Sequence, residues 1–232
     1  MRRTLVMLAT IAVLATACGS DTSTGSDVAD GFIVIDSNGS QLCGALLESY
    51  PPQCGDPIVR LGDLVPDAVV ALQSPDDASL APVQWTDYVL GVSGSIDDEV
   101  MTEVQLTDPV SEGASDGLIV RVADLGITVD LPVAFPIDIT NATDATQPLT
   151  FTSGQRAEVT LSQDGEELYR WSSGFGFTAA IEERFLEAGE RFGTVITDDP
   201  IDLPPGEYDA KAWVTATEAI NVVVEWVVTI DG

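Results

Sequence analysis

The chain has 232 residues, with 38 acidic against 9 basic side chains, no histidine and a formal net charge of -29. Such a charge repels nucleic acids and anionic lipid headgroups, so neither is an expected partner. Without histidine the chain forms no Ser-His-Asp or Cys-His nucleophile pair and no histidine-ligated metal site. We therefore expect a protein that is not an enzyme and that has no cofactor and no metal site.

Residues 1–18 have the pattern of an export signal. Two arginines near the start precede an apolar stretch at 4–14 that is too short to span a bilayer, and residues 15–17 are small, as a signal peptidase requires. Cys18 follows in the position of the lipidated cysteine of bacterial lipoproteins, where two acyl chains give stable anchoring. We predict a lipoprotein anchored at Cys18 to the extracytoplasmic side of the cell membrane. An ordinary secretory signal with an incidental cysteine is the alternative.

The next segments are predicted to be a tether and a small β-rich domain. Residues 19–30 are small and polar and bury too little surface to offset the entropy of ordering, which predicts a flexible tether. Residues 31–107 contain short apolar runs between turn formers, for which we expect an OB-like barrel. The runs are 31–35, 58–61, 68–72, 89–96 and 100–106. Cys43 and Cys54 lie in this domain, and in an exported chain a structural disulfide between them is the simplest interpretation.

Neighbouring carboxylates occur at Asp76-Asp77, at residues 97–99 and at Asp198-Asp199. Residues adjacent in a strand point to opposite faces, so these groups are poorly placed to act as acid and base pairs. We interpret them as solvated turn charges, with a loose calcium site as the lesser alternative. Residues 108–117 are polar, contain Pro, Gly and Ser, and are predicted to be a linker.

Residues 118–232 read as one strand after another, with little helical periodicity. Asp164-Gly165 between two alternating runs is a strong hairpin signal. Short strands at regular spacing predict an antiparallel sandwich. The expected strands are 118–122, 127–131, 133–140, 149–151, 157–162, 166–171, 184–186, 192–196, 207–215 and 221–230.

Several short motifs follow one another in this second half. They are Asn141-Ala142-Thr143, Ser153-Gly154-Gln155, Arg170-Trp171-Ser172 and Pro205-Gly206-Glu207-Tyr208. Their order over residues 133–214 resembles the BsuPI family of intracellular proteinase inhibitors. The resemblance implies an immunoglobulin-like β-sandwich and a protein-binding, inhibitory activity. Most of the motif residues also fit structural roles, with Phe151 and Trp171 as core anchors and Tyr208 as a tyrosine corner.

The segment that folding explains least is the loop Ser173, Gly174, Phe175, Gly176 and Phe177, which mixes flexible glycines with two large apolar rings. In one interpretation both rings fill the sandwich. In the other, Phe175 is exposed on a loop that occupies an apolar pocket of a partner, as aromatic anchors do in many interfaces. We therefore name residues 173–177 as the candidate protein-binding loop.

The functional prediction is a membrane-anchored lipoprotein with a BsuPI-like protein-binding module. An extracytoplasmic serine protease, inhibited by a loop that enters its cleft, is the sharpest form of this prediction, and another envelope protein is the broader partner class. A structural or accessory envelope scaffold is the alternative, and a cation-binding or small-molecule-binding lipoprotein ranks third on acidity alone.

Overall fold

The computed structural model describes residues 26–75 and 82–232. The predicted signal peptide, the lipidation site Cys18, the first part of the tether and the pair Asp76-Asp77 lie outside the described residues. Helix is confined, within the described part, to the short 3-10 turns η1 (Pro66–Ala68) and η2 (Trp171–Gly174). No helix in these ranges has the length and apolar character needed to cross a bilayer. The remainder is built from strands, which confirms the all-β prediction.

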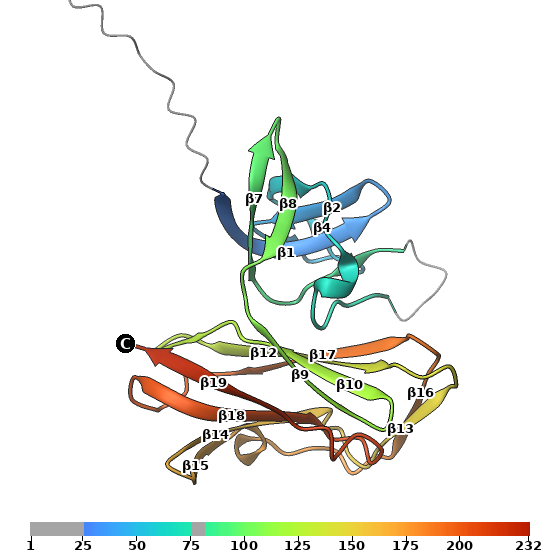
Figure 1. The fold of residues 1–232 in the computed structure, drawn as a ribbon, viewed down its shortest axis with the longest axis vertical. Helices are drawn as coiled ribbons and strands as arrows, with labels where there is room; N and C mark the ends of the chain where they lie inside the picture. Colours follow the sequence, from blue (N-terminus) through green and yellow to red (C-terminus); the bar gives the residue numbers. More distant parts are fainter. Residues whose placement is uncertain (1–25, 76–81) are drawn as a thin grey trace, which may run out of the picture.

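A five-stranded barrel forms the N-terminal part, as the sequence predicted (Figure 1). Strand β1 pairs with β2 on one side and with β7 on the other, while β5 and β8 pair in parallel, so that the ring closes. This closure removes the exposed strand edges that would otherwise template aggregation. The strands are β1 (Asp27–Asp36), β2 (Gly39–Cys43), β5 (Pro57–Leu61), β7 (Leu90–Asp97) and β8 (Val100–Leu106).

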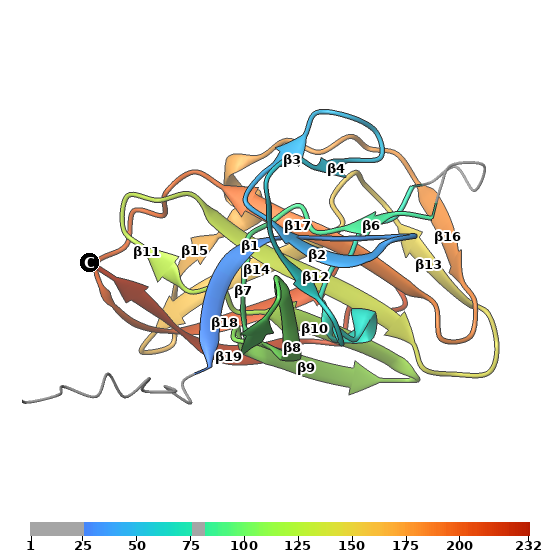
Figure 2. The ribbon, with the colours of Figure 1, turned by 90° about the horizontal axis from the view of Figure 1, so that it is seen from above.

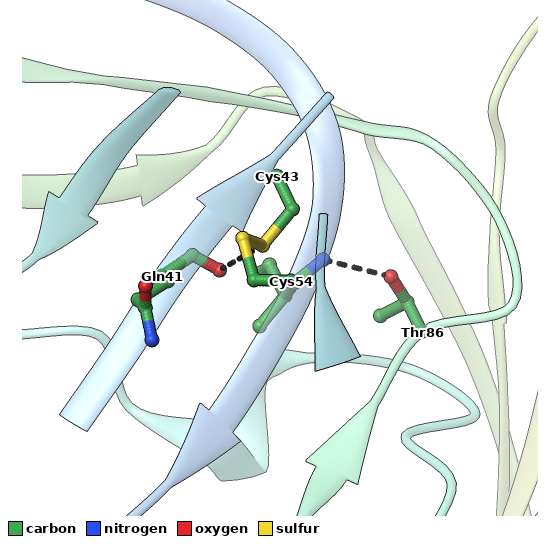
Figure 3. Close-up of a disulfide and its surroundings, with 5 residues drawn as sticks. Gln41, Cys43, Cys54 and Thr86 are labelled. Carbon is green, nitrogen blue, oxygen red and sulfur yellow. Dashed lines mark hydrogen bonds between the residues drawn. A yellow bond between two sulfur atoms is a disulfide. The ribbon is translucent and has the colours of Figure 1, made fainter. Parts of the chain in front are cut away.

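The disulfide ties a small hairpin to the barrel wall. Cys43 ends β2 and Cys54 lies in β4 (Gln53–Cys54), which pairs with β3 (Leu46–Leu47). Their Cα atoms are 5.6 Å apart, and Figure 3 shows the bridge between the strands, beside Gln41 and Thr86. Cys43 is buried with Trp85 of β6 (Gln84–Trp85), a short strand that extends the barrel sheet next to β1. The bridge therefore belongs to an apolar cluster at the barrel rim.

Two stacked sheets form the C-terminal sandwich, beneath the barrel in Figure 1. The sheet nearer the barrel contains β9 (Val110–Ser115), β10 (Leu118–Ala123), β12 (Val133–Asn141) and β17 (Arg191–Asp198). The other sheet contains β11 (Ile127–Thr128), β14 (Ala157–Gln163), β15 (Glu166–Arg170), β18 (Gly206–Val214) and β19 (Val224–Asp231). A separate antiparallel pair, β13 (Gln147–Phe151) with β16 (Glu182–Leu186), completes the C-terminal part. All pairings in the sandwich are antiparallel except the short β11–β19 pair.

Strand β12 is buried on both faces, which reveals how the two parts pack. Phe135, Ile137 and Ile139 point into the sandwich core, as alternation along a strand requires. On the opposite face, Ala134 packs against the barrel core and Asp138 is fully buried. The barrel thus covers the outer face of this sheet, and the view from above shows it lying over β12 and β10 (Figure 2).

Three sequence expectations are wrong in this region. Residues 27–30, expected in the tether, belong to β1 and pair with β7. Residues 110–115, expected in the linker, form β9 and pair with β10 across the turn at Asp116-Gly117, where both φ angles are positive. Polar composition conceals such strands because the ladder uses backbone groups, and only one face of each strand needs to be covered. The run 68–72 is not a strand: Ala68 ends η1, and residues 69–72 follow it as an irregular segment that is buried at 69–71.

A tyrosine corner stabilises the sandwich, as the sequence indicated. Tyr208 is buried, and its hydroxyl donates a 2.8 Å hydrogen bond to the carbonyl of Pro204. We expect Tyr208→Phe to lower the free energy of unfolding by about 1 kcal/mol, because the ring keeps its packing and only this hydrogen bond is lost. Urea unfolding of both proteins measures the difference. An unchanged midpoint would show that the corner contributes nothing to stability.

Candidate functional site

Three aromatic rings gather on the surface of the sandwich. The ring centroids of Trp171 and Phe175 are 4.9 Å apart, those of Trp171 and Phe177 are 5.5 Å apart, and those of the two phenylalanines are 6.4 Å apart. Trp171 packs against the sandwich core from its edge and donates from Nε1 to the carbonyl of Thr197. Phe175 keeps 44% of its surface exposed. The rings form an ordered apolar patch, which we call the aromatic cluster.

The structure excludes the interpretation in which both rings fill the sandwich. Neither phenylalanine enters the buried core; Phe177 is half-buried and Phe175 is exposed. Trp171, expected as a core anchor, is likewise only half-buried, whereas Phe151 is fully buried as expected. The reason is that the chain passes from β15, the edge strand of its sheet, directly into η2. This turn keeps Ser173 and Gly174 at the surface and places Trp171 at the edge of the sheet.

A buried carboxylate fastens the start of this loop. Glu158 of β14 points to the outer face of its sheet and is only 3% exposed. Its Oε1 accepts from the backbone N–H groups of Ser172 and Val159, each at 3.1 Å. Its Oε2 accepts from Nε2 of Gln155 at 3.2 Å and lies 3.5 Å from Nη1 of Arg170. Glu158 therefore holds η2 against the sheet and positions the aromatic cluster.

The far end of the loop is fastened by the turn before β14. The backbone N–H of Gly154 donates to the carbonyl of Thr178 at 2.9 Å. A Cβ at position 154 would lie 2.7 Å from Oγ1 of Thr178, so any larger residue would displace that hydroxyl, and glycine permits the close approach. The chain then continues through exposed residues 178–181 into β16. Both anchors, Glu158 and Gly154, come from one short stretch of the chain, which holds residues 172–178 as a supported surface loop.

A second buried carboxylate lies at the junction of barrel and sandwich. Asp138 accepts from Nε of Arg121 at 3.1 Å and from Nη2 at 2.8 Å, while Nε of Arg191 lies 3.6 Å away. Its Oδ2 also accepts from the backbone N–H of Ala71 in the barrel at 3.2 Å. We call Asp138, Arg121, Arg191 and the barrel segment 67–71 the junction cluster.

The two arginines of the junction cluster also bind the barrel directly. They donate to the carbonyls of Asp67 and Val69 at 2.8 to 3.0 Å. Burial lowers the pKa of Arg191. Burial acts the same way on Arg121 and is the largest single influence there, but the hydrogen bonds and charge of Asp138, together with the charges of Glu112 and Asp67, outweigh it and raise the pKa of Arg121. These opposite pKa directions agree with the distances, because Arg121 lies 2.8 and 3.1 Å from the Asp138 carboxylate and Arg191 lies 3.6 Å from it.

Sequence reasoning missed Glu158 and Asp138. Both occupy outward positions of strands whose alternate residues face the core, so the pattern predicts solvated charges at both. Only the folding of η2 onto one sheet, and of the barrel onto the other, buries them. The one signal that could have indicated their burial is an arginine on a neighbouring strand beside each carboxylate: Arg170 beside Glu158 and Arg121 beside Asp138.

Two further carboxylates lie half-buried where the barrel chain enters the sandwich. Burial raises the pKa of Asp108, although the N–H of Gly91 donates to it at 2.8 Å, and the nearby charges of Asp30 and Asp124 raise it further. Burial also raises the pKa of Asp124. Within residues 26–75 and 82–232, no set of three or more potential ligands is arranged to hold a metal ion.

A raised carboxyl pKa in the folded state makes the fold less stable as pH rises through that pKa. We expect Asp108→Asn to raise the thermal midpoint at pH 7, because asparagine still accepts from Gly91 without the charge. The gain should stay below about 1 kcal/mol, since the group is half exposed, and should vanish below about pH 3.9, where aspartate is also protonated in the unfolded chain. Calorimetry at both pH values tests this, with Asp144→Asn at an exposed turn as control. A gain that persists at low pH contradicts it.

The comparison with protein families agrees with the motif order. Residues 124–219 match the family model BsuPI, described as an intracellular proteinase inhibitor. Most of the sandwich is therefore similar to the BsuPI family. The matched range includes the aromatic cluster, Glu158 and Tyr208, whereas the barrel lies outside it. The description is that of an inhibitor rather than an enzyme.

Comparison with curated proteins gives no match. Among solved structures, a β-glucosidase from Listeria innocua with isofagomine has 12% identity and a TM-score of 0.29, covering 55% of this chain and 17% of the enzyme. The novel β-glucosidase EmGH1 from Erythrobacter marinus has 13% identity and a TM-score of 0.29, covering 54% and 16%. The D270A mutant of the Listeria innocua enzyme with laminaribiose has 14% identity and a TM-score of 0.28, covering 69% and 20%. The chain spans a fifth or less of the length of these enzymes.

Proposed function

We propose that this chain is an exported lipoprotein, anchored through Cys18 on the extracytoplasmic side of the membrane, whose BsuPI module binds a protein partner. The sharpest form of the proposal is inhibition of a serine protease by occupation of its active-site cleft. In this proposal the chain divides into a signal and tether, a barrel at residues 27–107 and a sandwich at residues 108–232. The export pattern of residues 1–18 supports the location, and the family match supports the inhibitory class.

One observation carries the choice of binding surface. An exposed aromatic ring, Phe175, lies on a loop whose two ends are hydrogen-bonded to the same stretch of the BsuPI module. Supported loops lose little conformational entropy on binding, and exposed aromatic anchors contribute strongly to protein interfaces. Such a loop inhibits by steric occupation of the cleft and needs no cofactor.

The test uses the chain from Gly19 onward, with the disulfide intact, titrated against several subtilisin-type and chymotrypsin-type proteases at known active-site concentration. We expect stoichiometric, saturable inhibition. Phe175→Ala should weaken inhibition about tenfold or more, because a truncated interface anchor costs 1.4 kcal/mol or more in typical scans. Ile58→Ala, at an exposed apolar position on the barrel strand β5, is the control. Full protease activity at every ratio would refute inhibition.

A scaffold role is the second candidate, and the junction cluster favours it. Asp138 and its two arginines join the barrel to the sandwich through buried charges, so that the two parts form a stiff unit. A stiff unit is suited to hold a surface at a fixed distance from its anchor. If no protease is inhibited, capture of a defined envelope partner by the BsuPI module would be the expected activity.

A further inference from the structure

We propose that the surface which enters the protease cleft is the uncharged strip of residues 175–181, and that this strip selects proteases with an apolar primary pocket over those that bind a basic side chain. The inference rests on the proposed inhibitory function and names its target class. It also moves the contact surface toward the C-terminus of the loop that the sequence indicated, since Ser173 and Gly174 are occupied in η2.

The backbone of the strip has the conformation that protease clefts accept. Phe175 has φ -123° and ψ 148°, which is extended, and no helix or turn interrupts the chain from there to the start of β16. Residues 178–180 are exposed, and Ile181 is 77% exposed. An extended chain lying on a protein surface can align with the main chain of a cleft as a substrate does.

The strip is ordered although it has no regular secondary structure. Glu158 holds the N–H of Ser172 just before it, Gly154 holds the carbonyl of Thr178 within it, and the ring of Phe175 stacks on Trp171. A segment held at these points presents its exposed residues in one arrangement, which lowers the entropic cost of binding. Glu158 is in this sense a positioning residue for the strip.

The chemistry of the strip defines the pocket it fits. Its sequence is Phe-Gly-Phe-Thr-Ala-Ala-Ile, with no charged residue. A trypsin-type pocket contains a buried aspartate that requires a basic side chain, whereas chymotrypsin-type and elastase-type pockets accept aromatic or small apolar side chains. The arginines on the adjoining segments are already engaged: Arg170 is paired with Glu167 and Glu158, Arg156 is paired with Glu182, and Arg184 lies over the ring of Phe192.

Residues on either side of the strip add a second selection. Glu166 on β15 and Glu183 on β16 are exposed, whereas their neighbours Glu167 and Glu182 are paired with Arg170 and Arg156, so a modest excess of negative charge flanks the apolar surface. A cleft with an acidic rim would be repelled, and one with a neutral or basic rim would be attracted. The partner we infer is therefore a protease with an apolar primary pocket and a rim without excess negative charge.

The experiment measures the inhibition constant of the chain from Gly19 onward against one trypsin-type, one chymotrypsin-type, one elastase-type and one subtilisin-type protease. Ile181→Glu is the test variant, and Ile58→Glu on the barrel, another exposed isoleucine given the same substitution, is the matched control. We expect inhibition of at least one apolar-pocket enzyme and none of the trypsin type. The inhibition constant should rise about tenfold or more for Ile181→Glu and stay within about twofold for Ile58→Glu.

The outcomes separate the inference from the function on which it rests. Inhibition that is equally strong in Ile181→Glu and the parent protein would show that residues 175–181 are not the contact surface. Inhibition that is strongest against the trypsin-type enzyme would show that they do not select an apolar pocket. Either result leaves the proposed inhibitory function intact. Absence of inhibition in all four enzymes overturns the proposed function and the strip together. Circular dichroism of both variants confirms that a loss of inhibition does not come from unfolding.

Discussion

Replacement of Asp138 by alanine should lower the free energy of unfolding by about 3 to 5 kcal/mol, the usual cost of removing one partner from a buried ion pair. The carboxylate is fully buried, and its loss leaves Arg121 without its ion-pair partner and Arg191 with only the exposed carboxylate of Asp67, 3.6 Å away. It also removes the acceptor of the Ala71 N–H, so a barrel backbone group loses its partner at the same time.

The packing around Asp138 leaves no room for the structure to adjust. Gly193 lies directly opposite Asp138 on β17, and a Cβ there would come within 2.6 Å of the Cα of Ala71. Barrel backbone thus lies in close contact with the sheet. We therefore expect the loss of Asp138 to loosen the barrel from the sandwich as well as to destabilise the fold.

Denaturant unfolding followed by tryptophan fluorescence and by circular dichroism measures this effect. Trp85 reports on the barrel, while Trp171, Trp213 and Trp226 lie in the sandwich. The control is Glu225→Ala, which removes the exposed partner of Lys211 and should cost less than about 1 kcal/mol. If Asp138→Ala and Glu225→Ala have the same small effect, the junction cluster does not hold the two parts together.

Glu158→Ala is expected to have the second largest effect, about 2 to 3 kcal/mol of stability, because it leaves the N–H groups of Ser172 and Val159 without their shared acceptor. The functional consequence should be larger than the stability loss suggests. Once η2 is released from the sheet, Trp171 and Phe175 are no longer held in place, and binding must then include the entropic cost of ordering the loop.

Hydrogen exchange at the Ser172 amide gives a direct readout, and it should accelerate strongly in Glu158→Ala while amides of the barrel stay unchanged. Glu158→Gln keeps one acceptor oxygen and should recover part of the protection. Glu167→Ala removes the exposed partner of the same Arg170 and is the matched control, with Ser172 protection preserved. Equal exchange at Ser172 in all four proteins would disprove the positioning role of Glu158.

The sequence alone determined the fold class, most strands of the sandwich and the order of the BsuPI-like motifs. These features follow from alternation and turn chemistry, which are local: Phe135, Ile137 and Ile139 mark one face of β12, and Asp164-Gly165 marks the hairpin between β14 and β15. The tyrosine corner was equally accessible, because Tyr208 follows a Pro-Gly pair at a strand entry.

The tertiary structure decided what the outward faces do. Asp138 and Glu158 read as solvated charges because nothing local shows that the barrel or η2 will cover them. Residues 110–115 read as a linker because their pairing partner, β10, supplies the hydrogen bonds that composition cannot show. Phe175 could fill the core or face solvent with the same sequence, and its exposure depends on Glu158 holding η2 at the sheet edge. Local periodicity encodes strands, whereas the packing of one module or turn on another depends on contacts between residues far apart in the chain.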